Sequence, residues 1–172
     1  MPRKSFRERL FAKITIDRDN PDACWRWTAA TNGDGYGRIW DGTHTPTGSP
    51  RLVLAHRAVY EIYRGPIPAG KQLDHTCHTR GCVNPEHLRP VTNKENHENL
   101  AGARRDNRSS GVRGVYWHKQ AGKWQVRVEH SGRKYHGGMF DDLDEAAEAA
   151  RQLRLKLFTH NDKDRTEGEA AA

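Results

Sequence analysis

Residues 73–99 constrain the fold more than any other stretch, because they hold an unusual density of side chains that bind metal ions. Within 27 positions the stretch carries four His, two of the three Cys of the chain, four Asn and one early Asp. Imidazole, thiolate and side-chain oxygen are the ligands that proteins offer to zinc and to harder cations. We therefore expect the rest of the chain to complete a scaffold around this stretch and to deliver it to a partner.

Composition limits the size of any core and suggests the partner. The chain has 172 residues, is 34% hydrophobic and has a mean hydropathy of −0.99, which favours one domain or two small ones. Its net charge of +7 and pI near 9.5 favour a polyanionic binding partner, in the first place nucleic acid. No apolar run approaches the roughly 18 residues of a membrane span, and the start MPRKSFRERLF lacks the apolar region of a signal peptide. We expect no membrane partner and a cytoplasmic protein.

Hydrophobic periodicity predicts short elements in two groups. In the first half it predicts helices over 5–14 and 52–65 and a hairpin of two strands over 24–28 and 35–40. A short strand over 72–76 and a short helix over 93–100 follow. A basic linker is expected over 101–110. In the second half it predicts three strands, over 112–117, 123–130 and 133–136, and then a helix over 141–158. A disordered tail is expected over 159–172.

The cysteines have the spacing of a structural zinc site. Cys77 and Cys82 are separated by four residues, His87 follows five residues later, and Gly81 would permit the tight turn between the sulfurs. A structural zinc needs four ligands, and the only remaining cysteine is Cys24. We predict a Zn²⁺ site of Cys24, Cys77, Cys82 and His87, against the simpler alternative of three buried thiols and a surface histidine.

A second set of side chains suggests hydrolysis of a phosphodiester. Asp74 and His75 lie at the end of the predicted strand 72–76, and Asn96 lies on the short helix that follows. A neutral imidazole can take a proton from water, while Asp and Asn oxygens hold a hard cation that stabilises the leaving oxygen. His78 and His97 are interpreted as surface residues or residues near nucleic acid.

Residues 20–100 resemble the HNH, or His-Me finger, nucleases, and most of all the zinc-containing homing endonucleases of introns and phages. The resemblance is carried by DH, CHTRGC, CVNPEHL and the final EN, and upstream by CWRWT, GYGRI, AHRAVY and GPIP. It implies a ββα-metal core around one catalytic Mg²⁺ (or Mn²⁺). His75 would be the general base, and Asp74 and Asn96 would hold the Mg²⁺. Asn84 would fix the hairpin loop and orient His75 through its backbone carbonyl.

Two assignments within this resemblance have alternatives. In HNH nucleases without zinc, the position of His87 can bind the catalytic metal. Because the Cys pair is present, His87 is assigned to zinc and Asn96 to catalysis. Arg57, in the AHR segment, is either a residue that grips the scissile phosphate or a surface arginine of a helix.

Residues 111–158 resemble the Apetala-type DNA-binding domain of plant ethylene-response factors. The resemblance is carried by GVRGV, GKW, GxF and the DEAAEAA helix, and it implies a three-stranded sheet that enters the major groove with a helix on its back. Tyr116, His118, Arg127 and His136 depart from the plant pattern. The candidate DNA contacts here and in the linker are Arg104, Arg105, Arg113, Tyr116, His118, Lys119, Lys123, Gln125, Arg127, Arg133 and Lys134.

The expected fold is α+β. A zinc-containing HNH nuclease domain over residues 1–100 is followed by the linker 101–110, a sheet-and-helix DNA-binding domain over 111–158 and the tail 159–172. The expected function is a sequence-directed DNA endonuclease of the homing type, encoded by a phage or mobile element, acting on double-stranded DNA in the host cell. A monomer would nick, and a homodimer would cut both strands. The alternatives are a DNA-binding regulator whose HNH unit is only a zinc-stabilised scaffold, and a protein that binds or cleaves RNA.

Overall fold

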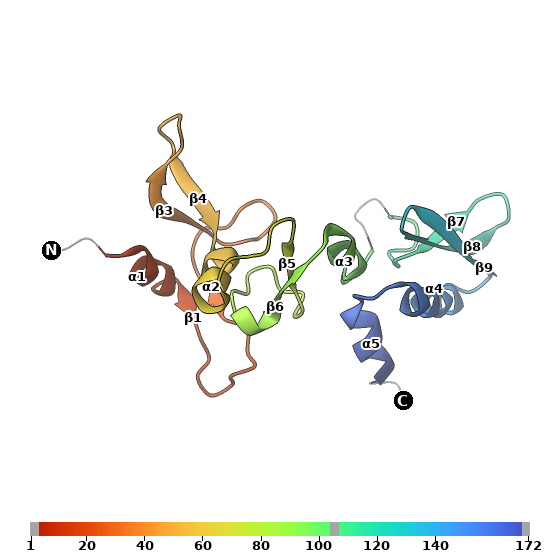
Figure 1. The fold of residues 1–172 in the computed structure, drawn as a ribbon. Coiled ribbons are helices and arrows are strands. Elements are labelled where there is room, and N and C mark those ends of the chain that lie inside the picture. The colour runs from red at the N-terminus through yellow and green to blue at the C-terminus, as the bar shows by residue number, and fades with distance from the viewer. Residues whose placement is uncertain (1–3, 104–106, 170–172) are drawn as a thin grey trace. The chain divides into compact units, whose positions relative to one another are not determined.

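The computed structural model describes residues 4–103 and 107–169 as a small α+β fold in two compact units (Figure 1). The N-terminal unit comprises Met1–Thr92 and the C-terminal unit Asn93–Ala172. The sheets are small and antiparallel: three pairs of strands in the first unit and one three-stranded sheet in the second. None of the helices in the described ranges is long and apolar enough to span a membrane.

The N-terminal unit surrounds one small core. Its elements are α1 (Phe6–Phe11), β1 (Ile14–Thr15), β2 (Arg26–Trp27), β3 (Arg38–His44), β4 (Pro50–Leu54), α2 (Ala55–Arg64), β5 (Gln72–His75), a 3₁₀ turn η1 (Pro85–His87) and β6 (Leu88–Val91). Helix α1 begins at Ser5, whose side chain forms a capping box with Glu8. The core consists of Leu10, Trp27, Ile39, Ala55, Ala58, Val59 and Val83.

Strand pairing in this unit differs from the expected hairpin. Strand β2 pairs with β1, and β3 pairs with β4, so the predicted pairing of 24–28 with 35–40 is wrong. The two segments touch through a side chain instead: the Trp27 ring lies over the backbone of Gly37, where a Cβ would come within 2.6 Å of the ring. Residues 52–54 belong to β4, so the predicted helix over 52–65 begins only at Ala55.

The C-terminal unit is a sheet covered on one face by a helix. Its elements are α3 (Asn93–Glu98), β7 (Val115–His118), β8 (Lys123–His130), β9 (Arg133–Phe140), α4 (Leu143–Leu157) and α5 (Asp162–Glu169). Helix α4 begins at Asp142, whose carboxylate accepts from the backbone N–H groups of Asp144 and Glu145. Ala146 and Ala150 are fully buried against Val115 and Val126, so small side chains let α4 lie close to the sheet.

Residues 162–169 form a helix within the stretch that was expected to be a disordered tail. Helix α5 is joined to α4 by an ion pair between Asp164 and the buried Arg154. Arg154 Nε lies 2.6 Å from Asp164 Oδ2, and Arg154 Nη2 lies 2.8 Å from Asp164 Oδ1. Burial works against ionisation of Asp164, but hydrogen bonding and the charge of Arg154 outweigh it and lower the pKa of that carboxyl. The prediction of disorder over 159–172 is therefore wrong for residues 159–169. One of the polar residues that suggested disorder, Asp164, is instead paired with a buried arginine.

The boundary between the units also lies elsewhere than the sequence suggested. The chain divides between Thr92 and Asn93 rather than near residue 100. Part of the expected linker 101–110 belongs to the C-terminal unit, because the Asn107 side-chain amide donates to the carbonyls of Val112 at 2.7 Å and Val115 at 2.9 Å. Arg104 and Arg105 lie outside the described residues.

Candidate functional site

Cys24, Cys77, Cys82 and His87 form one cluster in the N-terminal unit. Their ligand atoms all lie within 4.8 Å of one another, and His87 Nδ1 is 3.6 Å from Cys24 Sγ and 3.5 Å from Cys82 Sγ. A tetrahedral zinc with bonds of about 2.3 Å to sulfur and 2.0 Å to nitrogen separates such atoms by about 3.5 Å. The geometry and the donor set therefore fit a structural zinc ion, and they place His87 with the cysteines.

Backbone hydrogen bonds bring Cys24 to the other ligands. The chain around β2 runs beside residues 81–84: Trp27 N–H donates to Gly81 O at 3.0 Å, and Val83 N–H donates to Trp25 O at 2.9 Å. In the turn after Cys77, the left-handed conformation falls on His78, with φ 53°, and not on Gly81 as expected. The cluster thus joins two segments that lie more than fifty residues apart in the sequence.

Three sulfurs at this spacing cannot all ionise unless a cation lies between them. Hydrogen bonding from Cys82 lowers the pKa of the Cys77 thiol to about 4, whereas burial raises the pKa of the Cys24 thiol and the proximity of Cys77 raises that of Cys82. A divalent cation would stabilise all three thiolates together.

The ring of His75 is held in one orientation. Its Nε2 lies 3.0 Å from the backbone carbonyl of Cys82, which can only accept, so Nε2 carries the proton and Nδ1 the lone pair. Burial lowers the pKa of His75, more than the hydrogen bond to Cys82 and the charge of Asp74 raise it. His75 is therefore a neutral imidazole at neutral pH and can accept a proton at Nδ1.

Two further rings pack around His75, and the sequence reasoning missed both. The ring centroid of His56, on α2, lies 5.1 Å from that of His75, and the ring of Tyr36 lies 5.3 Å from His56 and 5.9 Å from His75. Burial lowers the pKa of His56 to about 3, so it adds no positive charge beside His75. Both residues stand in motifs of the resemblance, GYGRI and AHRAVY, and that placement was the available signal.

Asp74 is buried beside a guanidinium that the sequence reasoning also missed. Arg89, opposite Asp74 in the β5–β6 pair, donates to Asp74 Oδ2 from Nε at 3.0 Å and from Nη2 at 2.9 Å. The Asp74 side chain is 7% exposed and that of Arg89 is 31% exposed. A positive group thus already stabilises the carboxylate at the position predicted to hold a cation.

Asn84 fixes the hairpin loop, but it does not contact the ring of His75. Its amide donates to Ala23 O at 2.9 Å, and its side-chain oxygen accepts from Glu86 N–H at 3.0 Å at the start of η1. The carbonyl that orients the His75 ring belongs to Cys82, so the expected orienting role passes to a cysteine of the cluster.

Residues 53–98 match the HNH endonuclease family. The chain is also similar to three phage proteins. It is 38% identical over 77 residues to Protein 7.7 of Escherichia phage T7 and 32% identical over 102 residues to Protein 2.8 of the same phage. It is 41% identical over 64 residues to the uncharacterized gene 5.3 protein of Enterobacteria phage T3. These matches cover 45%, 59% and 37% of this chain, and 54%, 64% and 62% of the relatives. The chain thus spans between about half and two thirds of each relative. No solved structure matches it significantly.

The HNH segment, residues 53–98, extends into both units. It ends with α3, which carries Asn96, whereas the units divide before α3 begins. The segment also contains Arg57, on α2. Arg57 lines a cleft of about 660 Å³ together with Phe6, Asp41, Arg51 and Glu61, and neither Asp74 nor His75 lines that cleft. The expected grip of Arg57 on a scissile phosphate stays a prediction.

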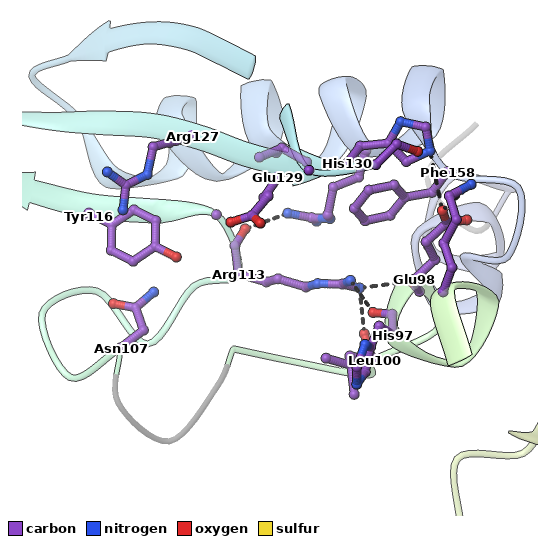
Figure 2. Close-up of a pocket in the computed structure, with 16 residues that line it drawn as sticks. His97, Glu98, Leu100, Asn107, Arg113, Tyr116, Arg127, Glu129, His130 and Phe158 are labelled. Carbon is purple, nitrogen blue, oxygen red and sulfur yellow. Dashed lines mark hydrogen bonds and ion pairs between the residues drawn. The ribbon is translucent and has the colours of Figure 1, made fainter. Parts of the chain in front are cut away.

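Most of the candidate DNA contacts after the HNH segment share the face of the sheet that α4 leaves open. Cross-strand partners point to the same face, and the register pairs Tyr116 with Gln125, His118 with Lys123, and Arg127 with His136, opposite the buried Val115 and Val126. Lys134 lies on the same side, and Lys119 and Arg133 are exposed in or beside the turns. The Arg127 guanidinium lies over the Tyr116 ring, 5.0 Å from its centroid (Figure 2).

Arg113 does not belong with this group. Its guanidinium donates to three backbone carbonyls at the end of α3 and lies over the Phe158 ring (Figure 2). Three hydrogen bonds thus engage Arg113 within the unit, and its contact with DNA stays a prediction. Lys123 in turn pairs with Asp141 at 2.8 Å, an exposed contact that a phosphate could replace.

Proposed function

We propose that the protein is a metal-dependent DNA endonuclease that uses His75 as its general base. The observation that carries the proposal is the fixed orientation of His75 within a segment that matches the HNH endonucleases: Nε2 bonds to Cys82 O, and Nδ1 holds the lone pair. Asp74 precedes His75 on β5, and the same segment contains Asn96. A scaffold alone would require none of these three side chains.

Each residue has a defined part in the reaction. His75 Nδ1 takes a proton from a water molecule, whose oxygen attacks the phosphorus as the bond to the leaving oxygen breaks. Asp74 and Asn96 would hold a Mg²⁺ or Mn²⁺ ion, which when bound supplies positive charge to the phosphate and the leaving oxygen. Tyr36 and His56 pack against the imidazole, and Cys82 O keeps its proton on Nε2.

The structural ion and the partner complete the proposal. Zinc held by Cys24, Cys77, Cys82 and His87 stabilises the loop that carries Cys82 O. The open face of the C-terminal sheet would bind duplex DNA in the manner of the plant domain it resembles, which would make the enzyme a sequence-directed nuclease of the homing type. The arrangement of basic and aromatic side chains on that face supports this part of the proposal.

His75→Ala provides the test. The variant should lose cleavage of plasmid DNA in Mg²⁺ or Mn²⁺ by at least about a thousandfold, because no other group takes the proton, while its affinity for DNA changes less than about twofold. His78→Asn is the matched control: it replaces a neighbouring histidine with a residue that tolerates φ 53°, and it should cleave as the wild type does.

The plasmid products would also show whether the protein nicks DNA, cuts both strands or only binds it. Nicked circles indicate one active site at a time, and linear plasmid indicates a dimer that cuts both strands. A wild-type protein that binds DNA but never cleaves it with either metal would favour the DNA-binding regulator.

A further inference from the structure

Helix α3 is too short to be stable alone. It has six residues, Asn93–Glu98, and an isolated helix needs more than about 12 residues in water. A cavity of about 530 Å³ lies between it and the sheet, lined by Lys94, His97, Tyr116, Arg127 and Val128 among others. Helix α3 is therefore not closely packed on the sheet. Contacts with other segments of the same unit hold the end of the helix (Figure 2).

Arg113 makes the first of these contacts. Its Nη1 donates to Glu98 O at 3.0 Å and Leu100 O at 2.9 Å, and its Nη2 donates to His97 O at 2.9 Å. The last carbonyls of a helix lack partners within it and carry partial negative charge, so a guanidinium there satisfies hydrogen bonds and opposes the helix dipole. The Phe158 ring, 5.1 Å below the guanidinium, keeps it in place.

Glu98 makes the second contact, which joins the helix to the segment that follows α4. The side chain is buried, and its Oε2 accepts from the backbone N–H of Thr159 at 2.9 Å and from the Thr159 hydroxyl at 3.1 Å. Its Oε1 lies 3.0 Å from Lys94 Nζ and 3.3 Å from His130 Nε2. Next to it, Asn99 Oδ1 accepts from the first N–H of α5, on Asp162, at 3.0 Å.

We propose that Arg113 is a positioning residue of the nuclease: it fixes α3, and with it Asn96, instead of contacting DNA. The proposal rests on the proposed function in one respect, the role of Asn96 at the catalytic metal. Residues 113 and 158–162 then complete the helix on which the HNH segment ends.

The test compares Arg113→Ala and Arg113→Lys with Arg127→Ala, an arginine of the open sheet face, in the full-length protein. Lysine keeps the charge that a phosphate needs but cannot donate to three carbonyls in a fixed fork. Both Arg113 variants should therefore speed amide exchange in residues 93–99 by about tenfold or more, and slow single-turnover cleavage at saturating DNA by a similar factor. Their DNA dissociation constants should stay within about twofold. Arg127→Ala should instead weaken DNA binding and leave amide exchange in residues 93–99 unchanged.

A double-mutant cycle links the effect to Asn96. If Arg113 acts through the placement of Asn96, Arg113→Ala should slow cleavage little further once Asn96→Ala is present. Additive losses would overturn the link to Asn96. Unchanged exchange in α3, with DNA affinity lost in Arg113→Ala and restored in Arg113→Lys, would show that Arg113 is a DNA ligand. If the wild type did not cleave at all, the proposed function would fail, and the exchange data would still decide whether Arg113 holds α3.

Discussion

At the scale of single residues, the ion pair with Arg89 stabilises the buried carboxylate of Asp74. A buried carboxylate without a cationic partner is costly, since burial removes the water that would stabilise its charge. Arg89 supplies two hydrogen bonds to Asp74 Oδ2 from the opposite strand. The guanidinium and a divalent ion would therefore stabilise the same carboxylate.

Arg89→Ala should make folding more dependent on Mg²⁺. Without the metal, we expect the free energy of unfolding to fall by about 1 to 3 kcal/mol, because Asp74 loses its charged partner. Saturating Mg²⁺ should restore part of that loss, since the ion replaces the missing charge. Urea unfolding with and without Mg²⁺ measures both values. Arg80→Ala, which removes an exposed arginine of the same unit, is the control and should show no added dependence on Mg²⁺. A loss that Mg²⁺ does not reduce would argue against Asp74 as a metal ligand.

At the scale of elements, the cluster of Cys24, Cys77, Cys82 and His87 joins segments that have little strand pairing. Strand β2 has two residues, and the segment around it meets residues 81–84 through a few backbone hydrogen bonds. The same loop presents Cys82 O to His75. A cation between the four ligands would thus stabilise the fold and the orientation of the His75 ring together.

Chelation of zinc should consequently affect both stability and activity. We expect about one zinc ion per chain, and a fall in the melting temperature of more than about 10 °C when a chelator removes it. Cys24→Ser should lower the zinc content, whereas His78→Asn, at a histidine outside the cluster, should not. Elemental analysis and thermal melts measure the two effects. A melting temperature that does not respond to removal of the metal would contradict a structural role.

These elements also show what sequence can predict and what it cannot. Spacing places Cys77, Cys82 and His87 together because the three lie within eleven residues, and Cys24 follows because no other cysteine remains. The contacts of α3 are different. Glu98 meets Thr159 across 61 positions, and Arg113 binds backbone carbonyls, which every residue has. No residue pattern distinguishes such an arginine from one that binds a phosphate.

The same limit applies to the strands and to the tail. Alternation correctly predicts β8 over 123–130, where one face is buried and the other open. It does not show which strand pairs with which, so β2 and β3 were joined as a hairpin although each pairs elsewhere. The tail was predicted to be disordered because the buried partner of Asp164, Arg154, lies ten positions earlier on another helix.

At the scale of the whole molecule, charge is distributed unevenly within the C-terminal unit. Residues 107–140, which include the sheet, contain seven Lys and Arg and one acidic residue. Residues 141–169, which include α4 and α5, contain five Lys and Arg and nine acidic residues. Because α4 covers one face of the sheet, the opposite face is the one a polyanion would approach. The net charge of +7 understates this preference, since the acidic helices offset the basic sheet.

A matched pair of lysines tests whether this asymmetry directs DNA binding. Lys134→Ala removes an exposed charge from the open face of the sheet, and Lys156→Ala removes an exposed charge from α4. If Lys134 contacts a phosphate, its loss should reduce the slope of log affinity against log salt concentration by about 0.9, because one fewer counterion is released on binding. Lys156→Ala should leave the slope unchanged. Titrations of a short duplex at several salt concentrations give both slopes. Equal reductions in the two variants would mean that the chain binds DNA by its overall charge, and the sheet face would lose its assigned role.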